Sequence, residues 1–249
     1  MGLPVIENVN NVCWITFDRP EVANALRIED VSCVEESVRG IGDAIRAIVF
    51  TGSGNRNFSA GMHLDTFRQA TPLSARSAIL CVANMLRAVR LCPVPTVAVL
   101  NGTCLGAAFE LALSCDIRIA HPGVRVGLPE IKLGIPSVAD AALLPAFVGI
   151  AKAREVILTG DSYTIEELGP GVANSVIPQS ELRTELDRFL AVLTAPNREV
   201  IAAQKELFEV WLNHGIDASV VASVDIFSEL FIDSTANDAI ETYVHGRRG

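Results

Sequence analysis

The segment TVAVLNGTCLGAAFELALSCDIRIA, residues Thr96–Ala120, decides the fold class. Its first five residues form an unbroken apolar or β-branched run that ends at Asn101-Gly102, which is typical of a strand covered on both faces. The small residues Gly106-Ala107-Ala108 then predict the start of a helix, and the apolar residues before Ala120 predict a second strand. A strand, a helix and a strand in succession indicate an α/β protein.

One charged residue, Glu110, stands inside this otherwise apolar helix. A carboxylate surrounded by alanine, phenylalanine and leucine is unfavourable to bury unless it has a partner or a chemical task. Glu110 is therefore the first candidate for a functional residue.

The rest of the chain predicts an α/β core followed by helices alone. Strands are expected at 5–9, 12–17, 47–51, 96–100 and 172–177, and helices at 28–38, 73–90, 138–148 and 151–158. Residues 57–65 are expected to form a loop, and Thr164 to cap a turn together with Glu167. Beyond residue 180, the spacing predicts helices at 181–193, 197–213, 217–231 and 237–244. We expect a core over 1–178 and a helical region over 179–249.

Composition narrows the function classes. The 249 residues carry a formal net charge of −9, which argues against a broad nucleic-acid surface. The most apolar window, 79–100, is interrupted by arginines and prolines and does not predict a membrane span. The six cysteines form no CxxC pair and no metal-ligand spacing with histidine, so we expect reduced thiols, a cytoplasmic location and no metal site.

Two small-residue loops could together stabilise an oxyanion. The loop 57–65 follows a buried strand and contains Ala60-Gly61-Met62, and the other loop ends at Ala107. Backbone N–H groups of Met62 and Ala107 aimed at one oxygen would stabilise negative charge on a carbonyl. Each loop alone is also typical of an ordinary strand-to-helix turn.

A second carboxylate, Glu130, follows Gly127-Leu128-Pro129. Two carboxylates in a partly apolar cleft can divide general acid and general base work. Alternatively, Glu130 is a solvent-exposed acidic residue at a helix start after proline.

Four stretches, in this order, resemble the enoyl-CoA hydratase/isomerase family, the crotonase superfamily. They are ITFDRPEVANAL (Ile15–Leu26), FSAGMHLD (Phe58–Asp65), VLNGTCLGAAFELALSCDIRIA (Val99–Ala120) and VGLPEIKLGIP (Val126–Pro136). The resemblance covers Pro4 to about Ile177 and extends to the C-terminal helices by pattern only. It implies a crotonase-like spiral of ββα units with a helical C-terminal trimerisation region.

The resemblance also implies residue roles. It assigns the oxyanion N–H groups to Met62 and Ala107, the addition of water to Glu110 and the protonation of Cα to Glu130. Further positions are implied to bind substrate or line the coenzyme A groove: Ala25, Leu26, Ala60, Gly61, His63, Leu64, Asp65, Gly106, Ser137 and Asp140.

The chain departs from the family pattern after Pro136. Where the family has a glycine-rich run, residues 136–141 read PSVADA, so that Ser137, Val138 and Asp140 are candidates for reshaping the acyl pocket or changing the reaction. His63 and Asp65 also replace more common family residues. Since lysines are few, contacts to the phosphates of coenzyme A are expected from an arginine such as Arg19 or Arg27, or from neighbouring subunits.

The expected function is therefore that of a hydro-lyase of fatty acid metabolism, which adds water syn to a 2-enoyl-CoA thioester and needs no cofactor beyond the coenzyme A of its substrate. An isomerase, hydrolase or decarboxylase acting on acyl-CoA is the alternative, and a non-catalytic or RNA-binding member is a third possibility. The expected partners are an acyl-CoA substrate and other copies of the chain in a homotrimer or dimer of trimers, without nucleic acid or membrane.

Overall fold

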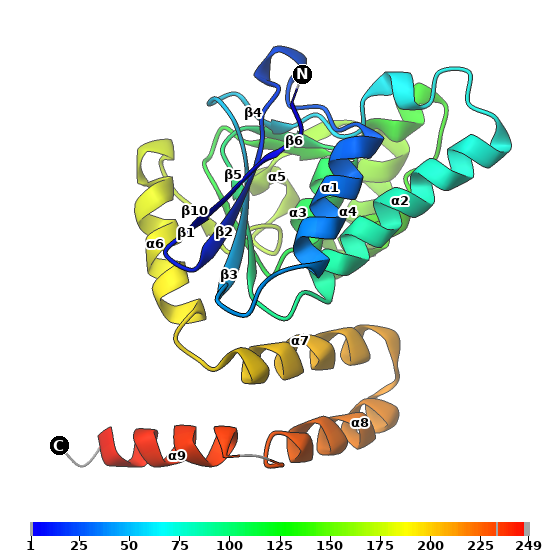
Figure 1. Cartoon of the computed structure of the whole chain (residues 1–249). Coiled ribbons are helices and arrows are strands. Elements are labelled where there is room, and N and C mark those ends of the chain that lie inside the picture. The colour runs from blue at the N-terminus through cyan, green and yellow to red at the C-terminus, as the bar shows by residue number, and fades with distance from the viewer. Residues whose placement is uncertain (1, 233, 247–249) are drawn as a thin grey trace.

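The computed structural model describes residues 2–232 and 234–246, and a six-stranded sheet forms the centre of this part of the chain. The strands occur in the order β1 (Val5–Val9), β2 (Val12–Phe17), β3 (Ala47–Gly52), β5 (Thr96–Leu100), β7 (Ile117–Ala120) and β10 (Ser175–Val176). β1 and β2 form an antiparallel hairpin, and every later pairing is parallel (Figure 1). The predicted strands are confirmed, except that the last one is limited to Ser175–Val176 within the expected 172–177.

A second, four-stranded sheet was missed by the sequence analysis. It consists of β4 (Asn57–Ser59), β6 (Thr103–Leu105), β8 (Arg125–Gly127) and β9 (Ser162–Thr164). β4, β6 and β8 are mutually parallel, and β9 pairs antiparallel with β8. The prediction of a loop over 57–65 is therefore wrong at its start. Strands of three residues are too short to show the alternation of apolar and polar residues by which strands are recognised.

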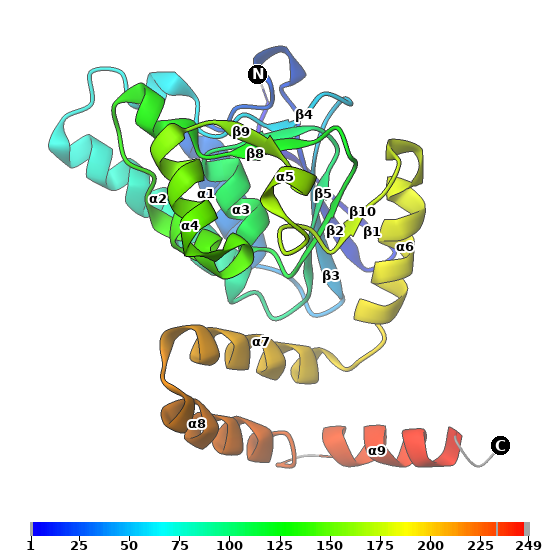
Figure 2. The same ribbon diagram turned by 180° about the vertical axis from the view of Figure 1, so that it is seen from behind.

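The helices of the core cover one face of the larger sheet. They are α1 (Ile28–Arg39), α2 (Pro72–Arg90), α3 (Ala107–Ser114) and α4 (Leu144–Thr159), followed by the short α5 (Ile165–Leu168). α1 to α4 lie on one side of the sheet in both views (Figures 1 and 2). The predicted capping of α5 by Thr164 and Glu167 is confirmed. Short 3-10 turns connect the elements: η1 (Pro20–Val22), η2 (Leu64–Thr66), η3 (Pro129–Leu133), η4 (Ala139–Leu143) and η5 (Gln179–Glu181).

The expectation of one helix over 138–148 is wrong. Residues Ala139–Leu143 form the separate turn η4, and α4 begins only at Leu144. Proline is tolerated in the first turn of a helix, so Pro145 marks the start of α4 rather than its interior. Inside α4, Gly149 has φ 76° and kinks the helix.

The central strands of the larger sheet are covered on both faces, and their neighbouring residues point to opposite sides. Along β3, Ile48 and Phe50 pack in the main core beneath the helices. Ala47 and Val49 instead pack with Leu186 of α6 (Leu182–Leu193) on the other face. The continuous apolar runs of these strands follow from this two-sided burial.

The remaining C-terminal helices extend away from the sheet. They are α7 (Arg198–Asn213), α8 (Ile216–Glu229) and α9 (Thr235–Gly246), and both views show them beside the core (Figures 1 and 2). The prediction that only helices follow residue 180 is confirmed for the described residues. Since α6 packs against the sheet, a boundary at residue 178 stays a prediction. Among the helices of 2–232 and 234–246, none has both the length and the apolar character needed to span a bilayer.

Candidate active site

Two neighbouring strands of the smaller sheet bring the two small-residue loops together. β4 leads to Gly61 and β6 leads to Gly106, and parallel neighbours end at the same edge of a sheet. A side chain on Gly61 would place Cβ 3.3 Å from the backbone N of Ala107, so the two loops are in close approach. The tertiary structure therefore places Met62 and Ala107, the predicted oxyanion donors, on adjacent loops.

Glycine is required at both positions by conformation and by space. Gly61 has φ +85° and Gly106 has φ +56°, in the left-handed region that side chains disfavour. A Cβ at Gly61 would lie 2.6 Å from the carbonyl oxygen of Leu105, and a Cβ at Gly106 would lie 2.7 Å from Glu130 Oε1. The absence of a side chain at each position thus allows the two loops and Glu130 to approach one another.

The N–H groups of Met62 and Ala107 are left out of the regular hydrogen-bond ladders. The bridge between Leu26 and Met62 uses the N–H of Leu26, bonded to Gly61 O at 2.8 Å, and the N–H of His63, bonded to Leu26 O at 2.7 Å. Ala107 is the first residue of α3, where N–H groups have no acceptor within the helix. Both donors are consequently available to a ligand oxygen.

A cavity of about 570 Å³ lies in front of these loops. It is lined by ten of the fourteen predicted site residues: Ala25, Ala60, Met62, His63, Leu64, Asp65, Gly106, Ala107, Glu110 and Glu130. Val138, expected to reshape the acyl pocket, also lines the cavity. Apolar side chains that were not expected there complete the wall, among them Val22, Phe67, Ile79, Val82, Leu133 and Ile135. Ile79 and Val82 lie at helical spacing on α2, a pattern that equally fits ordinary core packing and so gave no signal of a pocket.

Glu110 is buried and electrostatically perturbed. Its side chain comes from α3, the residue is 3 % exposed, and its Oε2 atom has no hydrogen-bond partner. Burial, reinforced by the negative charges of Glu130 and Asp140, raises the pKa of Glu110 to about 8. The nearby backbone N–H groups of Asp140 and Ala141 act in the opposite direction on this pKa. A carboxyl group that titrates near neutrality in a cavity has the properties of an acid–base catalyst.

Glu130 lines the same cavity as Glu110. It is a half-buried residue of η3, and its Oε2 atom accepts a hydrogen bond of 2.8 Å from Ser137 Oγ. The alternative of a merely solvent-exposed acidic residue does not describe this placement. Ser137 itself is not among the residues that line the cavity, and its hydroxyl orients Glu130 instead.

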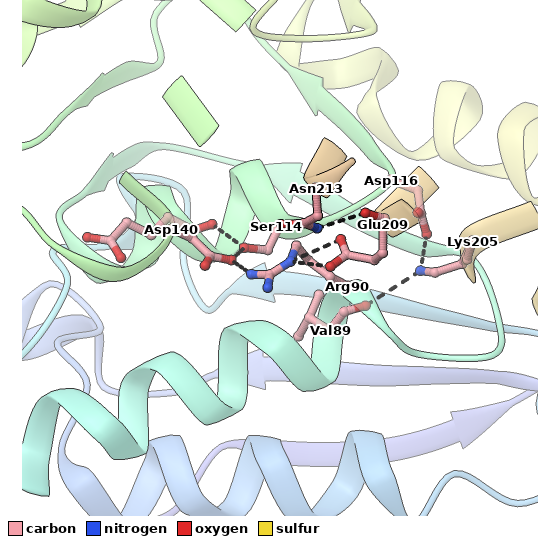
Figure 3. A network of polar contacts seen from close by, with 9 residues as sticks. Val89, Arg90, Ser114, Asp116, Asp140, Lys205, Glu209 and Asn213 are labelled. Atoms are coloured by element: carbon pink, nitrogen blue, oxygen red, sulfur yellow. Dashed lines mark hydrogen bonds and ion pairs between the residues drawn. The ribbon is translucent and has the colours of Figure 1, made fainter. Parts of the chain in front are cut away.

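Three further predicted residues lie outside the cavity wall. Leu26 and Gly61 are buried behind it and support the bridge to Met62. Asp140 turns away from the cavity, forms an ion pair with Arg90, and lies 2.6 Å from Ser114 Oγ (Figure 3). The extra carboxylate of this chain therefore faces the interior behind Glu110.

The two arginines that were expected to contact the phosphates lie in different surroundings. Arg19 is 6 % exposed, forms an ion pair with Asp30 and donates to Ala25 O at 2.9 Å. A phosphate contact by Arg19 is therefore a wrong prediction, since its guanidinium supports the loop from inside. Arg27 instead lines a second cavity of about 710 Å³, whose wall also includes His63 and Asp65. His63 Nδ1 accepts a hydrogen bond of 3.3 Å from Asp65 N at the start of η2.

Comparison with known proteins agrees with this geometry. A family model described as enoyl-CoA hydratase/isomerase matches residues 7–248. The chain is 26% identical to a short-chain-enoyl-CoA hydratase of Clostridium acetobutylicum, covering 98% of this chain and 95% of that protein. It is 25% identical to a crotonyl-CoA hydratase of Syntrophomonas wolfei, with the same two coverages.

A comparison with solved structures leads to the same family. The crystal structure of an enoyl-CoA hydratase from Bacillus anthracis superposes with a TM-score of 0.90 over 98% of this chain and 97% of that one. At 21% identity this likeness establishes the fold, and the crotonase-like α/β architecture expected from the sequence is confirmed. With the family model spanning nearly its whole length, the chain belongs to the enoyl-CoA hydratase/isomerase family.

Proposed function

We propose that the protein is an enoyl-CoA hydratase, which adds water reversibly to the double bond of a 2-enoyl-CoA thioester. The observation that carries this proposal is the presence of Glu110 and Glu130 in one cavity with two backbone donors, at Met62 and Ala107. Hydration needs a base for the water, an acid for Cα and a stabilised enolate, and this site has a group for each. The names of the relatives from Clostridium acetobutylicum and Syntrophomonas wolfei support the same reaction.

In the proposed mechanism, the thioester oxygen accepts hydrogen bonds from the N–H groups of Met62 and Ala107. These bonds stabilise the negative charge that develops on this oxygen as the enolate forms. Ionised Glu110 takes a proton from the water that attacks Cβ, and Glu130 donates a proton to Cα. Because both carboxylates line one cavity, delivery of water and proton to the same face of the double bond is expected.

The two adjacent cavities would hold different parts of the substrate. The apolar wall that includes Phe67, Ile79 and Val82 would hold the acyl chain. The adjacent cavity beside Arg27 would hold the nucleotide part of coenzyme A, because it shares His63 and Asp65 with the first cavity.

The proposal is tested by hydration of crotonyl-CoA, followed by loss of the absorbance of the conjugated thioester. Turnover at enzymatic rates is expected. Binding of crotonyl-CoA without hydration would contradict the proposal, and assays with 3-enoyl-CoA would then test isomerisation. A salt-dependent shift of RNA with no activity on any acyl-CoA would favour the RNA-binding alternative.

The rate of hydration is expected to depend steeply on pH. With a pKa of about 8, only about one in ten Glu110 side chains is ionised at pH 7. Since the proposed base must be ionised, kcat/KM for crotonyl-CoA should fall about tenfold for each pH unit below 7. A profile that is flat from pH 6 to pH 9 would contradict the assignment of Glu110 as the base.

We also propose that the chain assembles as a homotrimer or a dimer of trimers through its C-terminal helices. Large apolar side chains on α8 are each more than half exposed: Ile216, Val220, Val221, Val224 and Phe227. A patch of this kind marks an interaction surface. Light scattering should give the mass of three or six chains, and Phe227→Asp should lower it. A monomeric wild-type protein would contradict the proposal.

A cytoplasmic location is the last part of the proposal. All six cysteines are free thiols, and Cys13, Cys92, Cys104 and Cys115 are buried. Free thiols are typical of reducing compartments. Recovery of the protein with secreted or membrane fractions of its cells would contradict this location.

A further inference from the structure

A chain of ion pairs runs behind Glu110 and ends on a C-terminal helix. Arg90, the last residue of α2, pairs with Asp140 of η4 through Nη1, and its Nε atom lies 3.1 Å from Oε1 of Glu209 on α7 (Figure 3). The three side chains retain 19 %, 13 % and 18 % of their exposure in the order Arg90, Asp140, Glu209. They therefore form a partly desolvated cluster, in which electrostatic interactions are stronger than on an open surface.

Asp140 connects this cluster to Glu110 in two ways. The backbone N–H groups of Asp140 and Ala141 lie near the Glu110 carboxyl group and favour its ionised form. In addition, Ser114 Oγ lies 2.6 Å from Asp140 Oδ2 and 2.8 Å from the backbone oxygen of Glu110. Any movement of η4 would thus change the polar surroundings of Glu110.

The charged groups around Glu110 come from different elements. Glu130 on η3 and Asp140 on η4 both destabilise a negative charge on Glu110. Arg90 on α2 is the cation that pairs with Asp140, and Glu209 on α7 holds Arg90 from the other side. Removing Arg90 would leave Asp140 as an unpaired carboxylate in the interior, next to a second carboxylate.

We propose that Arg90 is a positioning residue of the active site, which holds η4 and its backbone donors against Glu110 and compensates the charge of Asp140. Glu209 fixes Arg90 in place, so that α7 contributes to the geometry of the site. The consequence is that Arg90 sets the pH at which Glu110 ionises. This inference rests on the hydratase reaction proposed above only for its kinetic readout.

The test is a direct titration of Glu110 in the full-length protein by infrared difference spectroscopy. The carboxylic acid band that disappears in Glu110→Gln identifies this residue. In the wild type, the band should titrate with a midpoint near pH 8. In Arg90→Met, the midpoint should rise by about one pH unit, because an uncompensated neighbouring charge disfavours ionisation. The acid limb of kcat/KM for crotonyl-CoA should move by the same amount, and Arg90→Lys should return it toward the wild type.

A double variant separates charge from structure. In Arg90→Met combined with Asp140→Asn, the charge that Arg90 compensates is gone while the side chain keeps its size. The midpoint should therefore return to within a few tenths of a pH unit of the wild-type value. Thermodynamic coupling between the two positions is what a direct interaction predicts.

Lys205→Met is the matched control. Lys205 lies one helical turn before Glu209 on α7 and is 5 % exposed, and its Nζ atom bonds to Asp116 Oδ2 at 2.6 Å and to Val89 O (Figure 3). This change removes a buried cation of α7 but no member of the Arg90–Asp140–Glu209 cluster, so the titration of Glu110 should be unchanged.

Each outcome has a definite meaning. A midpoint that does not move in Arg90→Met, or one that moves equally in Lys205→Met, would overturn the inference. So would a double variant that stays shifted, since the role of Arg90 would then be structural only. If the shift and its reversal are found in a protein without hydratase activity, the inference stands and the proposed function fails.

Discussion

Replacement of Glu110 by glutamine is expected to lower kcat for crotonyl-CoA hydration by about two to four orders of magnitude, the range that general base catalysis contributes. Glutamine has nearly the same shape and can still face the N–H groups of Asp140 and Ala141, but it cannot take a proton from water. Glu130→Gln is expected to cause a loss of similar size, because no acid would protonate Cα. Stopped-flow measurement of thioester absorbance with both variants tests this result.

The same Glu110→Gln change is expected to stabilise the protein above pH 5. The folded-state pKa of Glu110 lies near 8, above its ordinary value of 4.5, so the folded protein holds a proton that the unfolded chain has released between these pH values. The free energy of unfolding of the wild type therefore falls as pH rises through this window. Since one pKa unit corresponds to about 1.4 kcal/mol, the penalty at pH 8 is on the order of a few kcal/mol. Glutamine carries no such penalty.

Calorimetry at pH 5 and pH 8.5 should show this difference directly. The Tm of Glu110→Gln should exceed that of the wild type at pH 8.5 by more than at pH 5. Glu36→Gln, an exposed glutamate on α1, is the control and should change neither activity nor the pH dependence of Tm. If the difference in Tm between Glu110→Gln and the wild type is the same at both pH values, burial does not destabilise the carboxylate.

Gly61→Ala is expected to damage both stability and activity. Alanine would have to adopt φ +85°, and its Cβ would lie 2.6 Å from the carbonyl oxygen of Leu105. Backbone strain of this kind costs about 1–3 kcal/mol even without a clash. Because the collision is with backbone, the loop that carries Met62 must move, and loss of one oxyanion donor typically lowers kcat by about a hundredfold to a thousandfold.

Gly169→Ala provides the comparison for this experiment. Gly169 has φ +96°, but a Cβ there would meet nothing within 4 Å. It should lower the Tm through conformational strain alone and leave kcat unchanged. If Gly61→Ala retains wild-type kcat, the Met62 N–H is not an oxyanion donor.

The sequence was informative where a residue pattern is local. The apolar runs of β3 and β5 predicted the buried strands, since both faces of these strands are covered and every residue must be apolar. The spacing of apolar residues predicted α1, α2 and the C-terminal helices, because residues three and four positions apart share one face of a helix. It failed for the second sheet, whose strands of three residues leave no periodic signal.

Within the site, Glu110 could be identified from sequence because a lone carboxylate in an apolar helix is energetically conspicuous. Glu130, Met62 and Ala107 depended on the family motifs around them. The wall formed by Ile79 and Val82 was not foreseen, because apolar residues at helical spacing are found in every packed helix.

The amino-acid sequence by itself thus determined the α/β class, the helical C-terminal region and the residues able to do acid–base chemistry. Only the tertiary structure decided which of them meet. Arg90 and Asp140 are separated by 50 positions, and no local pattern connects them. Their ion pair directs Asp140 away from the cavity that the sequence suggested for it. Secondary structure follows from residues a few positions apart, whereas a catalytic environment depends on charges and burial contributed by elements distant in the chain.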